Sequence, residues 1–145
     1  MSLDTILRRQ HGVVSHEQAV ASGLTSDAVR WRVASGRWER IARGLYRIRH
    51  MPLTWESRAH ALALRLGPGG ALTLEAAAHL HDVERRQPPV LTGAVVGRQV
   101  QRLTGTRVTR RRSLDLVERR GLPVTSAATT VLDLTARPGV TWRET

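Results

Sequence analysis

The chain has 145 residues and a formal net charge of +11 at pH 7, because 23 basic residues, all of them arginine, stand against 12 acidic ones. Since lysine and cysteine are absent, a Walker A lysine, a Schiff-base lysine, a thiol nucleophile, a disulfide and a cysteine-based zinc site are all excluded. The positive surplus attracts polyanions and predicts a nucleic-acid partner.

The exclusive use of arginine has two explanations. A GC-rich coding bias accounts for most of the effect, and selection for bidentate contacts to phosphate and guanine is the second explanation. No apolar run approaches the length of a membrane span, and no secretory leader opens the chain, so we expect a cytoplasmic protein with no membrane contact.

Two short helices are predicted at the start of the chain. The first ends at residues 11–12, and the second begins at Ser15, where Gln18 three residues later completes a capping box. The side chains expected on their inner faces are Leu3, Ile6, Leu7, Ala19 and Val20.

A tight turn at Gly23 and a third helix follow. Leu24 plugs the turn into the core, Thr25 or Ser26 caps the helix, and the helix runs over residues 26–35 until Gly36. Val29 and Val33 are expected to point inward. The opposite side carries Asp27, Arg30, Trp31 and Ala34.

Residues 38–48 predict a hairpin that turns near Arg43-Gly44. Its expected core side chains are Ile41, Tyr46 and Ile48, whereas Arg40, Arg43 and Arg47 face outward and give a positive wing. The order of helix, turn, helix and wing is typical of a winged helix-turn-helix, which places one helix in the DNA major groove. We assign residues 1–50 to this DNA-binding domain.

Residues 51–145 predict a small α+β domain after the winged helix, so the fold class is α+β. A first helix is capped by Thr54 and has an inner face of Trp55, Ala59, Leu62 and Leu66. Residues 67–70 break it, and a helix over residues 73–81, strands over residues 90–96 and 106–111, and a last helix capped by Thr125 or Ser126 follow. The apolar positions of this last helix include Ala128, Val131 and Leu132.

DNA contact is the main functional prediction. Arg30 would reach a guanine edge or a phosphate, and Thr25 and Ser26 would offer hydroxyl and amide groups to a phosphate. Asp27 either accepts from cytosine or stabilises the helix N-terminus. Trp31 either stacks near DNA or packs on the second segment, and the third helix itself could also be an ordinary solvated face. The arginines expected to follow the DNA backbone are Arg37, Arg40, Arg43 and Arg47.

Other polar clusters are less specific. Arg110, Arg111 and Arg112, with Arg119 and Arg120, form a second basic cluster that either extends the DNA footprint or binds an acidic protein or RNA. His79 and His81 point in different directions on a helix and have no third ligand nearby, so a structural role is favoured. We therefore expect no catalytic residue, no metal and no cofactor.

The sequence resembles the AbiEi-like antitoxins of type IV toxin–antitoxin (abortive infection) systems. The similar stretches are HGVVSHEQAVASGLTSDAVRWRVASGRWERIARGLYRI, LTLEAAAHLHDV and GLPVTSAATTVLDLTA, so the resemblance covers residues 11 to 136. It implies a winged helix that binds operator DNA and represses its own operon, with contacts at Thr25, Ser26, Arg30, Arg40, Arg43 and Arg47. It also implies a functional partner, a nucleotidyltransferase toxin, that the second domain neutralises without a stable complex.

The chain departs from its relatives in two places. Ala127 stands where the last motif usually has proline, and related chains are commonly longer, some of them with an endonuclease domain that we expect to be missing here. Two alternatives stay open: an interaction module that binds protein or RNA, and a truncated relative of an endonuclease-fused protein without activity. Winged helices often bind as dimers, so a homodimer is also open, although no dimer seam is evident.

Overall fold

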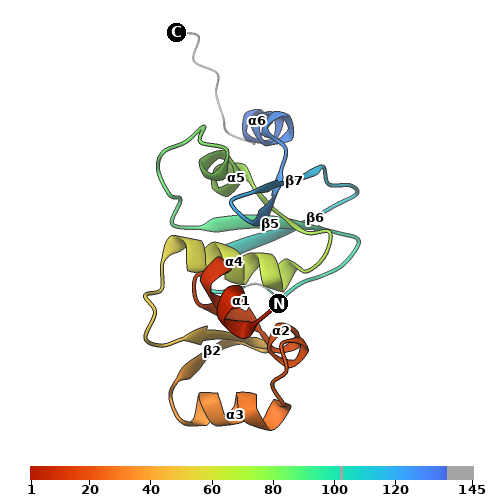
Figure 1. The fold of residues 1–145 in the computed structure, drawn as a ribbon. Coiled ribbons are helices and arrows are strands. Elements are labelled where there is room, and N and C mark those ends of the chain that lie inside the picture. The colour runs from red at the N-terminus through yellow and green to blue at the C-terminus, as the bar shows by residue number, and fades with distance from the viewer. Residues whose placement is uncertain (102, 137–145) are drawn as a thin grey trace.

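A computed structural model describes residues 1–101 and 103–136 of the chain (Figure 1). The molecule is elongated, with α3 at one end and α6 at the other. The N-terminal lobe, residues 1–50, contains α1 Leu3–Arg9, β1 Val13–Ser15, α2 His16–Ala21, α3 Ser26–Ala34, β2 Trp38–Ala42 and β3 Leu45–Ile48. The C-terminal lobe, from residue 51 on, contains α4 Trp55–Leu66, β4 Ala71–Thr73, α5 Leu74–Leu80, β5 Leu91–Val96, β6 Thr106–Arg111, β7 Leu116–Arg119, β8 Leu122–Thr125 and α6 Ala127–Thr135. The predicted α+β fold class is confirmed.

The sheet of the N-terminal lobe has three antiparallel strands in the order β1-β3-β2. The predicted hairpin is confirmed, because β2 ends at Ala42 and β3 begins at Leu45, with Arg43 and Gly44 in the turn between them. Strand β1 was not predicted, and it pairs with β3 on the side away from β2. We refer to β1, β2 and β3 together as the wing sheet.

The caps of the N-terminal helices follow the sequence pattern. Ser15 and Gln18 form the predicted capping box of α2. Ala19 is fully buried as expected, but Val20 is 43% exposed, so its predicted burial is wrong. Successive residues of a helix point about 100° apart, so only one of these neighbours can point into the lobe. The core on the helical side of the wing sheet contains Leu7, Val14, Ala19, Val29, Trp38 and Ile48.

The C-terminal lobe is built on a mixed sheet with the strand order β6-β5-β4-β8-β7. Strand β5 is parallel to β6 and antiparallel to β4, while β4 is parallel to β8 and β8 is antiparallel to β7. The strands predicted over residues 90–96 and 106–111 correspond to β5 and β6. Strands β4, β7 and β8 were not predicted, and β8 occupies the segment that was expected only to lead into the last helix.

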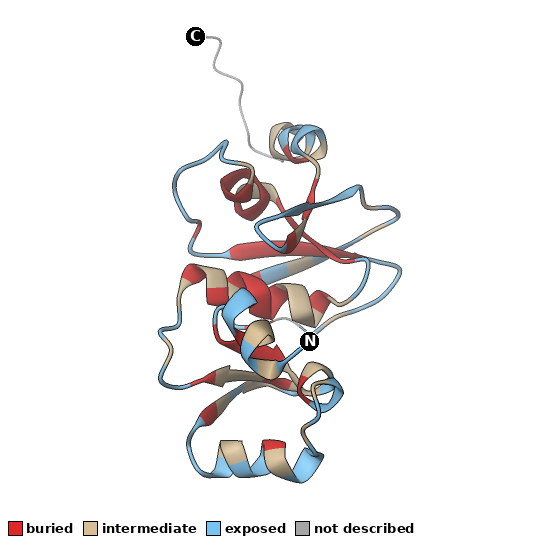
Figure 2. Ribbon diagram, viewed as in Figure 1, coloured by how far each residue is buried: buried red, intermediate tan, exposed pale blue. Residues whose placement is uncertain are grey.

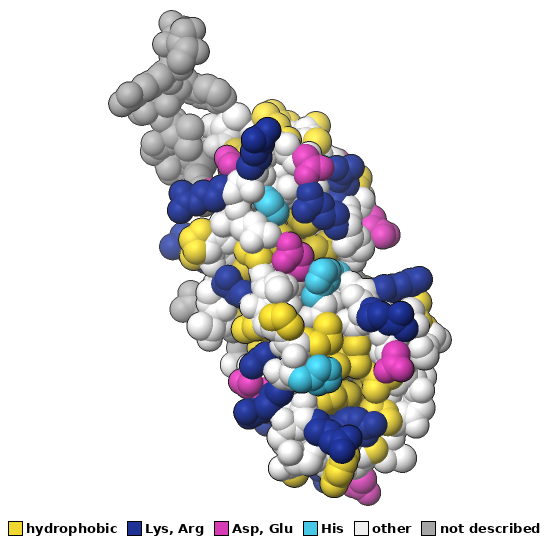
Figure 3. Space-filling view, turned by 60° about the vertical axis from the view of Figure 1, so that its left-hand side comes forward, with side chains coloured by type: hydrophobic (Ala, Val, Ile, Leu, Met, Phe, Trp, Pro, Cys, Tyr) yellow, Lys and Arg dark blue, Asp and Glu magenta, His cyan; other side chains and the backbone are white. Residues whose placement is uncertain are grey.

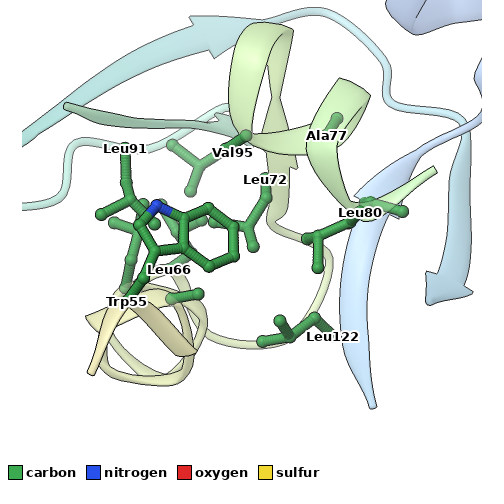
Figure 4. Close-up of a cluster of buried hydrophobic side chains, with 12 residues drawn as sticks. Trp55, Leu66, Leu72, Ala77, Leu80, Leu91, Val95 and Leu122 are labelled. Carbon is green, nitrogen blue, oxygen red and sulfur yellow. The ribbon is translucent and has the colours of Figure 1, made fainter. Parts of the chain in front are cut away.

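The main core lies between α4, α5 and the five-stranded sheet (Figure 4). Leu66, Leu72, Leu91 and Leu122 come from α4 and three strands, and each is at most 1% exposed. Trp55 closes one side of this core, and its indole N–H donates to the carbonyl of Pro88 at 2.9 Å. The predicted inner face of α4, Trp55, Ala59, Leu62 and Leu66, is buried throughout. By contrast, Val131 and Leu132 of α6 are 48% and 66% exposed.

A third apolar cluster joins the two lobes. Val13 and Leu45 of the wing sheet pack with Ala61 of α4 and with Leu103, and all four are buried. Adjacent residues of a strand point to opposite faces, so Val14 faces the N-terminal helices while Val13 faces α4. The wing sheet is therefore covered on both faces, and α4 lies between the two sheets (Figure 1).

Two polar contacts cross the same junction. The hydroxyl of Ser57 on α4 donates to the carbonyl of His11 at 2.8 Å. The imidazole of His60, also on α4, stacks on that of His11 with 5.5 Å between ring centroids. The pKa of His60 is lowered from 6.5 to about 4, mainly by burial and also by the neighbouring His11, while Glu56 acts in the opposite direction. The two lobes thus contact each other through a packed, partly polar surface.

Candidate nucleic-acid interface

Helix α3 is positioned by its cap and by one apolar face. The hydroxyl of Thr25 accepts a hydrogen bond from the amide of Ala28 at 3.1 Å, which makes Thr25 the N-cap. Gly23 has φ +111°, a conformation that L side chains rarely adopt, and it allows the tight turn from α2. Val29 is 1% exposed and Val33 packs against the same core, so the predicted inward face is confirmed.

The outward face of α3 is open to solvent. Figure 2 shows α3 at the end of the molecule farthest from the C-terminal lobe, with most of its residues exposed or half-buried. Thr25, Ser26, Asp27, Arg30 and Trp31 are all exposed. The helix expected to read DNA is therefore accessible over its full length.

Arg30 and Asp27 form an ion pair one helical turn apart. Their side chains are 77% and 87% exposed, so water screens the pair and it adds only about 0.3–0.5 kcal/mol to stability. A ligand that offers Arg30 a better acceptor can replace Asp27 at little cost. The pairing nevertheless lowers the positive potential of α3 in the free protein.

Trp31 was expected either to stack near DNA or to pack on the second segment. The packing prediction is wrong. The side chain of Trp31 is 53% exposed, and the guanidinium of Arg37 lies 4.8 Å from the centroid of its ring. This cation–π contact holds an arginine at the C-terminal end of α3. Trp38 is 4% exposed and belongs to the core, as expected.

The three wing arginines have different environments. Arg40 and Arg43 are exposed, as predicted. Arg47 was expected to face outward in the same way, and this is wrong: its side chain is only 23% exposed. The strand register places Glu39 directly opposite Arg47, and the guanidinium donates to the Glu39 carboxylate at 3.0 and 3.2 Å. Arg47 thus fastens β2 to β3 and has no free charge to offer a phosphate.

Residues 1–49 match the family described as "Transcriptional regulator, AbiEi antitoxin". The match covers about a third of the chain, and within it the N-terminal lobe is similar to AbiEi antitoxin-type regulators. No curated protein matches the chain. The family match ends before the C-terminal lobe, so the resemblance of residues 72–83 and 121–136 to AbiEi-like antitoxins stays a prediction.

The wing turn of the N-terminal lobe lies against the C-terminal lobe. Arg65, near the end of α4, donates from its guanidinium Nη2 to the backbone carbonyl of Arg43 at 3.2 Å. Sequence reasoning missed Arg65, and no local pattern could have identified it. Residues 43 and 65 meet only because α4 packs on the wing sheet, which is a long-range consequence of the fold.

Several arginines of the C-terminal lobe form ion pairs within the protein. Arg111 pairs with Asp133 of α6 at 2.6 Å, and Arg119 and Arg120 both pair with Asp82. The remaining two residues of the predicted second cluster, Arg110 and Arg112, are exposed. Figure 3 shows one face of the molecule on which arginine side chains are spread over both lobes.

His79 and His81, the two histidines considered as metal ligands, form hydrogen bonds with backbone carbonyls. A ring nitrogen of His79 lies 3.0 Å from the carbonyl of Glu84, and one of His81 lies 2.7 Å from the carbonyl of Thr125. Within residues 1–101 and 103–136, no group of three or more potential ligand side chains is placed to hold a metal ion. In the same residues, no helix combines the length and apolarity that crossing a bilayer requires.

Proposed function

We propose that this protein binds operator DNA through α3 and the wing hairpin and represses its own operon, as the antitoxin of a type IV toxin–antitoxin system. One observation carries the proposal: a lobe that matches the AbiEi regulator family presents α3 uncovered, with Arg30 and Arg37 on its solvent side. In this proposal, residues 1–50 are the DNA-binding domain, and the rest of the chain is the antitoxin domain.

Each exposed polar group of the interface has a distinct role. Arg30 exchanges Asp27 for a guanine edge in the major groove, where a bidentate contact discriminates between bases by about 1–3 kcal/mol. The first turn of α3, with Ser26, holds a backbone phosphate through free amides and hydroxyl groups. The remaining cationic groups, Arg37, Arg40 and Arg43, bind phosphates on either side of the groove.

The affinity should depend steeply on salt. Three arginine–phosphate contacts correspond to a slope of about −2.7 in log K against log salt, which is about a 40-fold loss of affinity from about 50 to about 200 mM salt. A variant that lacks one of these contacts should lose only about 12-fold over the same range. Affinity that does not change with salt would contradict the proposal.

The decisive experiment measures fluorescence anisotropy of the protein on its own upstream DNA and on a scrambled duplex. Arg37→Ala should weaken binding to both duplexes to the same extent and reduce the salt slope by about 1, as expected for a phosphate contact. Arg30→Ala should reduce the preference for the upstream duplex. Arg85→Ala is the matched control, because Arg85 is an exposed arginine in the loop between α5 and β5, outside the interface.

The antitoxin role is tested separately in cells. If a nucleotidyltransferase is encoded next to this gene, co-expression of the full-length protein should restore growth that the toxin arrests. The Arg30→Ala variant should restore growth equally well, because in this proposal neutralisation belongs to the C-terminal lobe and not to α3. Growth arrest that persists with the full-length protein would contradict the antitoxin role but not the DNA-binding role.

A second candidate function is an interaction module that binds a protein or RNA. The observation in its favour is the Asp27–Arg30 pair next to the exposed Trp31, because the Asp27 carboxylate offsets part of the positive charge on the outward face of α3. The same titrations distinguish the two functions. If the intact protein shows no preference for any duplex and binds single-stranded RNA more tightly, the interaction module replaces the repressor.

A further inference from the structure

A recess of about 670 Å³ lies where the wing hairpin, α2 and α4 meet. Arg40 and Arg43 line it from the wing, and Arg65 lines it from α4. His16 of α2 and Tyr46 of β3 complete its polar wall, with 6.4 Å between their ring centroids. Both lobes therefore contribute to a single concave surface.

The recess carries more positive than negative charge. Three arginines line it, against one acidic residue, Glu17. The guanidinium groups of Arg40 and Arg43 make no hydrogen bond or ion pair within residues 1–101 and 103–136. Within the described residues, none of the three arginines forms an ion pair, and cationic groups that converge in this way from two lobes are suited to a multiply charged anion.

Arg65 is the most constrained of these groups. Its Nη2 donates to the wing carbonyl, while its Nε is buried and has no hydrogen-bond partner in the part of the chain that the structure describes. A buried donor left without an acceptor costs free energy, so such a group is informative about a missing ligand. An anion in the recess would supply acceptors beside this guanidinium.

The size of the recess indicates the kind of anion. Small-molecule sites commonly have volumes of about 300–1,000 Å³, whereas a single backbone phosphate needs much less space. Leu64, Pro68 and the ring of Tyr46 add apolar surface to the arginine wall. A ligand with both a polyphosphate chain and a flat apolar part fits this combination.

We propose that this recess binds a nucleoside polyphosphate, with Arg40, Arg43 and Arg65 on the phosphates and Tyr46 beside the base. Arg40 and Arg43 also belong to the proposed DNA interface, so the ligand competes with operator DNA for them. The competition rests on the proposed function, whereas binding in the recess does not. Such a ligand would release the repressor from its operator.

Binding is tested first without DNA, by calorimetry on the full-length protein at constant ionic strength, with ATP and inorganic pyrophosphate as probes. Arg65→Gln and Arg40→Gln should each weaken ATP binding about 10-fold, a typical effect of losing one charge-assisted contact. Arg85→Gln, the control with the same loss of charge, should stay within about two-fold of the wild type. Because Arg40 is exposed, its variant keeps the test valid if Arg65→Gln does not fold.

ATP binding with the same affinity in all variants, or no binding at concentrations of about 1 mM, overturns the proposal. Binding of pyrophosphate as tight as that of ATP overturns the role of Tyr46 and the apolar wall. If Arg65→Gln weakens DNA binding but the wild type binds neither probe, the recess holds a phosphate of the DNA backbone and the small-molecule proposal is wrong.

Competition is then measured by adding ATP to the preformed complex with upstream DNA at fixed ionic strength. ATP should displace the DNA from the wild type, and about 10-fold more should be needed with Arg65→Gln. Displacement that is equal in both proteins contradicts the shared site. If the wild type binds ATP but no DNA, the proposed DNA-binding function is wrong, whereas the proposed nucleotide site in the recess is supported.

Discussion

Acid should weaken the fold through His60, and the structure gives the size of this effect. The imidazole lies on α4 at the junction of the lobes, is 5% exposed and stacks on His11. Burial, together with the nearby His11, lowers its pKa from 6.5 to about 4, although Glu56 acts in the opposite direction. The folded protein therefore keeps His60 neutral at pH values where the unfolded chain binds a proton.

The direction of the pH effect on the free energy of unfolding follows from this difference in proton binding. Above pH 6.5 both states are neutral at His60, and the full stability is present. As the pH falls from 6.5 towards 4, only the unfolded state takes up the proton, so the free energy of unfolding decreases. Between about pH 7.5 and about pH 4.5 the loss amounts to about 2.5 kcal/mol, a large part of the stability of a small domain.

Urea unfolding of the wild type, His60→Gln and His50→Gln at these two pH values measures the loss. Apart from the substituted histidine, the three proteins contain the same titratable groups, so the comparison between them reports on that histidine. His60→Gln should show about 2.5 kcal/mol less pH dependence than the wild type, while His50→Gln, which changes an exposed histidine, should match the wild type. Equal pH dependence in His60→Gln and the wild type would refute the reasoning.

Three further substitutions test the packing, each by urea unfolding at neutral pH. Ser57→Ala removes the hydrogen bond to the carbonyl of His11 and one half of a capping box, and should cost about 1–2 kcal/mol. Gly93→Ala should cost about 1–3 kcal/mol, because the new Cβ would lie 2.7 Å from Cδ1 of Leu66. Trp55→Phe leaves a buried carbonyl without its donor and should cost about 1–3 kcal/mol, whereas an unchanged midpoint would contradict the core described here.

Helix starts could be predicted from the sequence because caps are local chemistry. Ser15, Thr25 and Thr54 each accept a hydrogen bond from an amide three residues later, and this spacing is visible in the chain itself. The hairpin of β2 and β3 was predictable for a similar reason, since its turn residues and alternating side chains lie within residues 38–48.

Short strands with distant partners were not predictable in the same way. Strands β1 and β4 have three residues each, and their hydrogen-bond partners lie far along the chain. Such segments carry too few residues for a period of two to stand out, and their backbone pairs are set by tertiary structure. Strand β8 was hidden further by Pro123 within it.

The same distinction applies to the candidate site. The exposed face of α3 followed from its helical period, and the structure agrees. The environment of Arg47 depended on the cross-strand register with Glu39, and the contact of Arg65 depended on packing between lobes, so neither was visible in local sequence. The charge count predicts a polyanionic partner, but it does not show which arginines are free of contacts within the protein.

The packing of the wing sheet affects which roles α3 and the wing hairpin would have in the proposed DNA interface. A wing that is mobile in the free protein must lose conformational entropy when it contacts DNA. Here the hairpin is held by β1 at its edge and by α4 across one face, so in the proposed complex Arg40 and Arg43 would contact phosphates without that additional cost. The same packing places the wing turn against Arg65, whose guanidinium donates to the carbonyl of Arg43. In the proposed complex with DNA, we therefore expect α3 to recognise bases and the wing to add affinity through the DNA backbone.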